Sequence, residues 1–238
     1  MQELLLDVKE RFKQLGILER ERKPFELILF AVYSYILGLS YRKTVKAISF
    51  LELPISHVAI WKWTQKLGKK LKYRMFQIQE LPQIILVDET EIQVGGRTAW
   101  VWFATNPYNG KILHIKVSYS RTSLVALIFF QEMIRIYGRR PRIAITDGGV
   151  WYPYALQRLG IQHEVFSGGI RSYVESIIGC IKQRTNHFYN YFPCGCRFAK
   201  HVENWLNLVV FEHNVAFISE GRGCFLEFTQ RLMEVLSC

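Results

Sequence analysis

Three acidic residues, Asp88, Asp147 and Glu175, stand at positions where a fold can bring them together. Asp88 directly follows a short, continuous apolar run, which is typical of a strand that is covered on both faces. Asp147 directly follows a second predicted strand, and Glu175 lies in the first turns of a predicted helix. Carboxylates that lie close together repel one another, and hard divalent cations, which prefer oxygen ligands, relieve that repulsion. The three acids therefore predict a divalent metal site.

Two divalent ions about 4 Å apart would activate an attacking oxygen and stabilise the leaving oxygen of an in-line phosphoryl displacement. A pair of Mg²⁺ ions is therefore expected, and Mn²⁺ is able to substitute. Each acid also has a simpler interpretation, because aspartates are common in turns at strand ends and a helix glutamate is commonly solvated. The chain also offers competing carboxylates, namely Glu89, Glu91 and Glu164.

The order of predicted elements in residues 81–238 supports the metal site. Gly95-Gly96 and the cluster at 106–110 are turn signals that separate three successive antiparallel strands. In chain order we expect strands over 84–87, 98–104 and 111–117, a helix over 122–137, a strand over 142–146, a helix over 151–159, a strand over 162–165 and a helix over 170–188. This order predicts an α/β fold with a ribonuclease-H-like mixed sheet flanked by helices, in which the strands that precede Asp88 and Asp147 are neighbours.

Residues 1–80 are predicted to be a separate, all-α region. We expect helices over 1–23, 24–37, from Ser40 to the break at Leu53-Pro54-Ile55, and from His57 to about Leu67. Proline breaks the third helix, Ser56 is a suitable N-cap for the fourth, and Gly68 is expected to end it. Two short helices joined by a tight turn are typical of a helix-turn-helix. An ordinary helical hairpin is the alternative.

The net charge of +11 is concentrated in this helical region. The segment from Ser40 to Arg74 contains nine basic residues and a single acid, Glu52, so its net charge is +8. A solvated helix face is the ordinary explanation of a charge run, but so local an excess favours a polyanion such as DNA. The second helix of the predicted helix-turn-helix is the one that begins at His57. Its first turns would meet base edges through Ser56, His57, Ala59, Ile60 and Lys62, with Trp61 or Trp63 facing the core. The expected DNA contacts in this region are Arg42, Lys43, Ser56, His57, Lys62 and Lys66.

Composition excludes several classes of protein. Half of the 238 residues are hydrophobic, so the chain can bury a core and is not a disordered polymer. The longest nearly continuous apolar run, 27–39, is shorter than the roughly 18 residues that a membrane span needs. An odd number of cysteines, five, argues against a disulfide framework. With no signal peptide recognised, we expect a cytoplasmic, nucleoid-associated protein with no membrane partner.

Several segments, in the correct order, resemble the DDE transposases of prokaryotic insertion sequences, and most closely the archaeal branch of the IS-six family. They include Tyr41-Arg42-Lys43, Ser56-His57-Val58-Ala59-Ile60-Trp61-Lys62-Trp63, Val87-Asp88-Glu89-Thr90, Trp100-Val101-Trp102, Ser120-Arg121, Thr146-Asp147-Gly148-Gly149-Val150-Trp151-Tyr152, Arg171-Ser172-Tyr173-Val174-Glu175 and Ile181-Lys182-Gln183-Arg184-Thr185. The resemblance implies that Asp88, Asp147 and Glu175 are both the catalytic residues and the metal ligands. It also implies that Lys182 contacts the DNA backbone, and Arg184 in the same segment is a further candidate.

The resemblance implies a metal-dependent DNA strand cleavage and strand transfer at the terminal inverted repeats of a mobile element. Double-stranded DNA, both element ends and target, is the expected partner, and a homodimer or larger assembly would bring two ends together. Two alternatives keep the fold. One is a catalytically inactive, transposase-derived DNA-binding protein, because Gly179 and Cys180 after Glu175 are poor helix formers. The other is a ribonuclease-H-like nuclease or resolvase.

Overall fold

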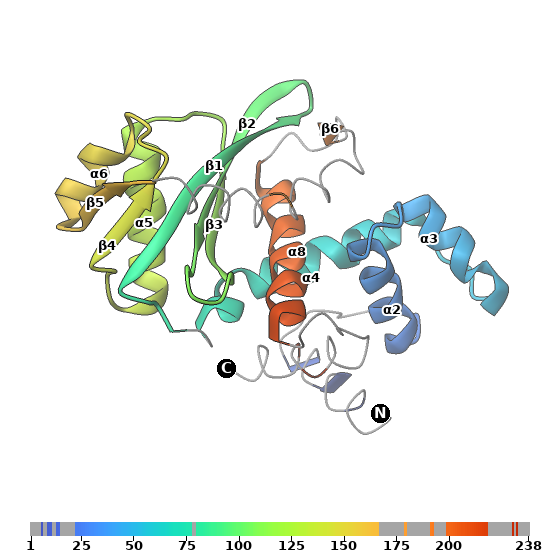
Figure 1. Cartoon of the computed structure of the whole chain (residues 1–238). Coiled ribbons are helices and arrows are strands. Elements are labelled where there is room, and N and C mark those ends of the chain that lie inside the picture. The colour runs from blue at the N-terminus through green and yellow to red at the C-terminus, as the bar shows by residue number, and fades with distance from the viewer. Residues whose placement is uncertain are drawn as a thin grey trace. The chain divides into compact units, whose positions relative to one another are not determined.

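The computed structural model describes residues 22–77, 80–166, 191–192 and 199–218, together with isolated residues 6, 9, 10, 13, 14, 179, 230 and 232. The chain forms two compact units (Figure 1). One unit comprises Met1–Met75 with Asn204–Cys238, and the other comprises Phe76–Glu203. The sequence-based division into 1–80 and 81–238 stays a prediction. The predicted helices over 1–23 and 170–188 lie outside the continuously described residues.

The Phe76–Glu203 unit is built on a mixed sheet with the strand order β3-β2-β1-β4-β5. The strands are β1 (Ile84–Val94), β2 (Arg97–Thr105), β3 (Ile112–Ser118), β4 (Ile143–Thr146) and β5 (Gln162–Val165), and the short β6 (Tyr191–Phe192) pairs with the end of β1. Strands β1, β2 and β3 are antiparallel neighbours, while β4 and β5 run parallel to β1. This topology confirms the predicted ribonuclease-H-like sheet.

Strand β1 is longer than the sequence predicted. The apolar run at 84–87 is only its first part, and the strand continues to Val94 before the Gly95-Gly96 turn. The second part alternates, with Thr90, Ile92 and Val94 buried, so it has the period of a strand with one covered face. Both turn glycines have positive φ values, 58° and 78°, which suit a tight hairpin. Asp88 therefore lies within β1 and not after its end.

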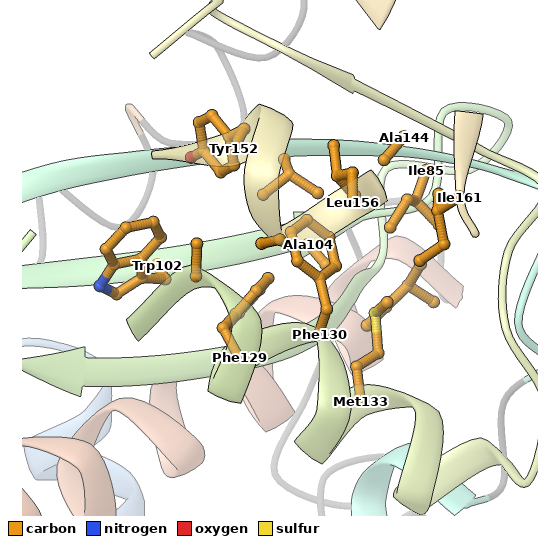
Figure 2. Close-up of a cluster of buried hydrophobic side chains, with 14 of the residues drawn as sticks. Ile85, Trp102, Ala104, Phe129, Phe130, Met133, Ala144, Tyr152, Leu156 and Ile161 are labelled. Carbon is orange, nitrogen blue, oxygen red and sulfur yellow. The ribbon is translucent and has the colours of Figure 1, made fainter. Parts of the chain in front are cut away.

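Two helices cover one face of the sheet. Helix α5 (Ser123–Tyr137) is capped by the Thr122 side chain and ends at Gly138, and α6 (Tyr152–Leu159) ends at Gly160. Their inward side chains pack against odd-numbered residues of β1 and even-numbered residues of β2 (Figure 2). The fully buried core residues include Ile85, Trp102, Phe129, Phe130, Met133, Tyr152 and Leu156. This apolar core fixes the start of α6 against β1.

A polar cluster joins β3 to α5. The Lys116 ammonium lies 2.9 Å from one carboxylate oxygen of Glu132, and Nε2 of His114 lies 3.5 Å from the other. Burial alone would raise the pKa of Glu132, but hydrogen bonding to His114 and Lys116 outweighs it and lowers this pKa to about 2. The ionised carboxylate is therefore favoured in the folded state.

The Phe25–Ile36 helix (α2), α3 (Tyr41–Ile48), the 3₁₀ turn η1 (Ser49–Leu51), α4 (His57–Gln77) and most of α8 (Ala199–Ile218) belong to the other unit. None of the described helices is long and apolar enough to cross a membrane. The side chains of Ser40 and Ser56 accept hydrogen bonds from backbone N–H groups in the first turns of α3 and α4, as expected of N-caps.

Gly68 does not end α4, contrary to the prediction. The helix continues to Gln77 and is crossed by α8 (Figure 1). Gly68 lies against Asn204 of α8. A Cβ atom at Gly68 would lie only 1.9 Å from the backbone oxygen of Asn204. The amide of Asn207 donates a hydrogen bond to the Gly68 carbonyl at 3.1 Å, and that of Asn204 donates to Gln65 at 3.0 Å. The glycine thus permits close helix packing.

Replacing Gly68 with Ala should destabilise the protein by about 1–3 kcal/mol, because the clash with α8 outweighs the roughly 1 kcal/mol that alanine gains in helix propensity. Guanidinium-induced unfolding followed by circular dichroism measures the difference. Lys69→Ala, at the exposed neighbouring position of the same helix, is the control and should change stability little. A Gly68→Ala variant more stable than wild type would contradict this packing role.

Glu132→Gln should lower the free energy of unfolding by roughly 2 kcal/mol at pH 7. The pKa of Glu132 is below its ordinary value of 4.5 in the folded protein, so its stabilisation is present above about pH 4.5 and disappears as the pH falls towards 2. Unfolding of both proteins across this range should show the curves converging in acid. The exposed Glu80→Gln is the control. A difference in unfolding free energy between wild type and Glu132→Gln that is independent of pH, or equal to the difference for Glu80→Gln, would refute this role of Glu132.

Candidate metal centre at the carboxyl end of β4

The register between β1 and β4 brings Asp88 and Asp147 to the same level of the sheet. Leu86 is the partner of Ile145 in the parallel pairing, and each aspartate lies two residues further along its chain. Side chains two residues apart share a face of a strand. Asp88, Glu89 and Asp147 each offer a carboxylate oxygen, and these three oxygens lie within 4.8 Å of one another. The structure therefore gathers two of the three predicted ligands.

The loop that follows Asp147 is shaped by two glycines. Gly148 has a φ of 87°, which a residue with a side chain rarely adopts. A Cβ atom at Gly149 would lie 2.5 Å from the indole ring of Trp151. The Gly149 N–H donates to Oδ1 of Asp147 at 2.9 Å, and the Gly148 N–H donates to the Thr146 hydroxyl at 3.1 Å. These contacts hold the exposed Asp147 carboxylate in place beyond the end of β4.

Glu89 lies at the base of the cluster, with its side chain 2% exposed. The Tyr152 hydroxyl donates to one carboxylate oxygen, and Arg121 donates to the other at 3.3 Å. Burial raises the pKa of Glu89, with Asp147 raising it further, while Tyr152 and Arg121 oppose the shift. Burial also raises the pKa of Tyr152 well above its ordinary value, so this hydroxyl remains protonated and able to donate.

His163, on β5, adds a titratable group beside the cluster. Its Nε2 lies 2.8 Å from the Thr146 hydroxyl. Burial lowers the pKa of His163, and the nearby Asp147 partly opposes this shift. The neutral ring is consequently favoured, and it connects β5 to the last residue of β4.

The predicted site residues have different outcomes. Asp88 and Asp147 come together, whereas Glu175 lies outside the described residues. Glu89, which the sequence offered only as a competing carboxylate, joins the cluster. Glu91 is exposed on the β1–β2 hairpin, and Glu164 is exposed on β5. No role was predicted for Arg121 or Tyr152, although both lie in segments that resemble the transposase family. Their contacts with Glu89 join distant parts of the chain and have no local sequence signal.

The predicted DNA contacts on α3 and α4 are surface residues in the structure. The side chains of Arg42, Lys43, His57, Lys62 and Lys66 are exposed, and the exposed Ser56 caps α4. Ile60 is fully buried, so its expected contact with base edges is wrong: it faces the helical core. Of the two tryptophans considered for the core, Trp63 is 2% exposed and takes that place. Lys182 and Arg184 lie outside the described residues.

The donor set of the cluster fits a hard divalent cation. The three side chains present only carboxylate oxygens, which are the ligands that Mg²⁺ and Mn²⁺ prefer. Asp147 is exposed and Asp88 is partly exposed, so a hydrated ion can reach both. Both oxygens of Glu89 already accept hydrogen bonds. Asp88 and Asp147 are therefore the better candidates for direct ligands among the described residues.

The chain is similar in sequence to a known family and to one curated protein, and part of it matches solved structures. A family model described as a DDE domain matches residues 83–175. Uncharacterized protein MJ0017 of Methanocaldococcus jannaschii is 30% identical over 207 residues, which cover 87% of this chain and 94% of that protein. The catalytic core domain of HTLV-2 integrase, in complex with magnesium, is 18% identical with a TM-score of 0.41, and the match covers 56% of this chain and 86% of that one. The BIV integrase catalytic core domain is 16% identical with a TM-score of 0.39, over 53% of this chain and 82% of that one.

Asp147→Asn should weaken Mn²⁺ binding by at least about tenfold, because it removes a negatively charged ligand from the cluster. Electron paramagnetic resonance of free Mn²⁺ during titration measures the affinity. Glu164→Gln removes an exposed carboxylate outside the cluster and serves as the matched control, with binding expected to be unchanged. Equal Mn²⁺ affinity in wild type and Asp147→Asn would exclude this site.

Proposed function

We propose that this chain, which carries a DDE domain over residues 83–175 and belongs to the same family as the uncharacterized protein MJ0017, is a DDE transposase that cuts and joins DNA strands. The reaction is a metal-dependent phosphoryl transfer at the terminal inverted repeats of an insertion sequence. Within the family, we assign the chain to the archaeal branch of the IS-six group on the segments around Asp88, Asp147 and Glu175.

The observation that carries this proposal is the close approach of Asp88, on β1, to Asp147, which directly follows the neighbouring parallel strand β4, inside the matched DDE domain. Turn-forming aspartates need no such register, and two carboxylates held together without a cation repel one another. Glu175, at the end of the matched segment, is the proposed third ligand.

The proposed ions are Mg²⁺, with Mn²⁺ as a substitute, and when bound they supply charge stabilisation at the attacking and leaving oxygens of the phosphodiester. The chain's own residues prepare the site. Asp88 and Asp147 would hold the ions, and the Gly149 N–H orients the Asp147 carboxylate. Tyr152 and Arg121 donate hydrogen bonds to Glu89, so the charge of Glu89 contributes less to the repulsion among the three carboxylates. A 3′-hydroxyl released at an element end would then attack a target strand, with no covalent protein intermediate.

DNA recognition is assigned to the helical region. Exposed basic side chains follow one face of α4 at helical spacing, which fits contact with a phosphate backbone. They are Lys62, Lys66, Lys69 and Lys70, and α3 adds Arg42, Lys43 and Lys46. Together with Ser56 and His57 at the start of α4, they form the proposed helix-turn-helix surface. Lys182 and Arg184 are proposed to contact DNA near the acids. Joining two element ends requires a homodimer or a larger assembly on DNA.

Asp147→Ala should abolish strand transfer, by about 10³-fold or more, while leaving DNA binding intact. The measurement is transfer of a labelled, pre-cut end, taken from the DNA that flanks the gene, into a plasmid with Mn²⁺. Glu164→Ala is the matched control and should retain activity, because its carboxylate is exposed and outside the cluster.

Other outcomes of this assay separate the alternatives. Strand joining by Asp147→Ala would refute the assigned role of this residue. Tight end binding with no product from the wild type would favour an inactive DNA-binding protein. Cutting of branched or unrelated DNA without joining would favour a nuclease or resolvase.

A further inference from the structure

The Arg121 guanidinium is held between two tryptophan rings at the edge of the acidic cluster. Its Cζ atom lies 3.8 Å from the ring centroid of Trp100 and 4.0 Å from that of Trp151. Trp100 lies on β2, Arg121 lies in the loop before α5, and Trp151 is the residue that precedes α6. A planar guanidinium stacked on aromatic faces is restrained, whereas a lysine ammonium would lose that stacking. The fold thus fixes the orientation of this cation.

One edge of the guanidinium is directed at Glu89. Nη1 of Arg121 lies 3.3 Å from Oε1 of Glu89, whose other oxygen accepts from Tyr152. Glu89 in turn offers an oxygen within 4.8 Å of those of Asp88 and Asp147. Arg121 is therefore adjacent, through a single buried side chain, to the two aspartates proposed as metal ligands.

The ion pair with Glu89 leaves part of the Arg121 side chain exposed to solvent. Its side chain is 36% exposed, while that of Glu89 is 2% exposed. A guanidinium has five N–H donors in a rigid fork, and in the described part of the chain the hydrogen bond from Arg121 to Glu89 uses Nη1 alone. If neutralising Glu89 were the whole role, a buried pair would serve it; two stacked indoles and an exposed edge instead suit a cation that meets an external anion.

We propose that Arg121 is a phosphate-binding residue, which contacts the DNA backbone beside the phosphodiester that enters the Asp88–Asp147 cluster. This inference rests on the proposed function, since it takes DNA as the substrate of that cluster. Trp100 and Trp151 restrain the guanidinium, and Glu89 sets its direction. A phosphate on the exposed edge receives charge-assisted hydrogen bonds from a donor whose orientation is already fixed, so little conformational entropy is lost on binding.

The alternative role, in which Arg121 only neutralises Glu89, makes a different prediction in a double variant. Arg121→Met with Glu89→Gln removes both charges and retains side chains of similar length, so no carboxylate is left unpaired. If Arg121 serves Glu89 alone, the double variant should bind DNA as the wild type does. If Arg121 binds phosphate, the double variant should remain defective.

The test measures fluorescence anisotropy of a labelled duplex of unrelated sequence with the full chain, without activating metal, at several KCl concentrations. We expect the Arg121→Met/Glu89→Gln variant to bind several-fold more weakly than wild type, with the slope of log K against log salt smaller by about one phosphate contact, roughly 0.9. Arg121→Lys should show an intermediate affinity, with a melting temperature close to that of the wild type. Thermal unfolding of each variant confirms that folding is retained; if the double variant is unfolded, the Arg121→Lys comparison at high and low salt decides the same question.

Wild-type affinity and salt slope in the double variant would overturn the role of Arg121 and leave the proposed function standing. Absence of DNA binding by the wild-type chain would instead overturn the proposed function, and this inference with it. A loss of strand-transfer rate in the double variant at saturating DNA, with unchanged DNA affinity, would also contradict phosphate binding, because it would place Arg121 in the chemical step alone.

Discussion

Electrostatic repulsion among Asp88, Glu89 and Asp147 is the constraint on which the site depends. Three carboxylate oxygens within 4.8 Å of one another cannot all remain ionised without compensation. The structure compensates one of them internally, because Tyr152 and Arg121 donate hydrogen bonds to Glu89. The two aspartates retain their demand for positive charge, which a hard divalent cation would satisfy. Charge balance thus connects the arrangement of the residues to phosphoryl-transfer chemistry.

The rest of the fold keeps these charges in place. Parallel pairing of β1 with β4 sets Asp88 level with Asp147, and the Gly148-Gly149 turn directs a backbone N–H to the Asp147 carboxylate. The apolar core anchors Tyr152 at the start of α6, so that its hydroxyl reaches Glu89. Rigid strands and a packed helix are better suited than loops to hold such a site, because their side chains have little freedom to move apart.

Much of this arrangement could be predicted from local sequence patterns. Periodicity and turn residues located strands β1 to β5 and helices α5 and α6 of the sheet unit, and the resulting order identified Asp88 and Asp147 as neighbours; the short strand β6 was not predicted. Local patterns gave wrong predictions where tertiary contacts determine the structure. Gly68 was predicted to end α4, but it permits α8 to pack closely against that helix. Ile60 was predicted to contact base edges, but it is buried in the helical core. The partnership of Glu89 with Arg121 and Tyr152 joins residues 32 and 63 positions apart, which no local pattern encodes.

The central claim is that Asp88 and Asp147 jointly bind a divalent cation, and anomalous diffraction from crystals grown with MnCl₂ tests it most directly. The account predicts a manganese peak at about 2.2 Å from a carboxylate oxygen of each aspartate, with Glu89 still paired to Arg121. A peak bound to Glu89 with Arg121 displaced, or no peak between the two aspartates at saturating Mn²⁺, would contradict it.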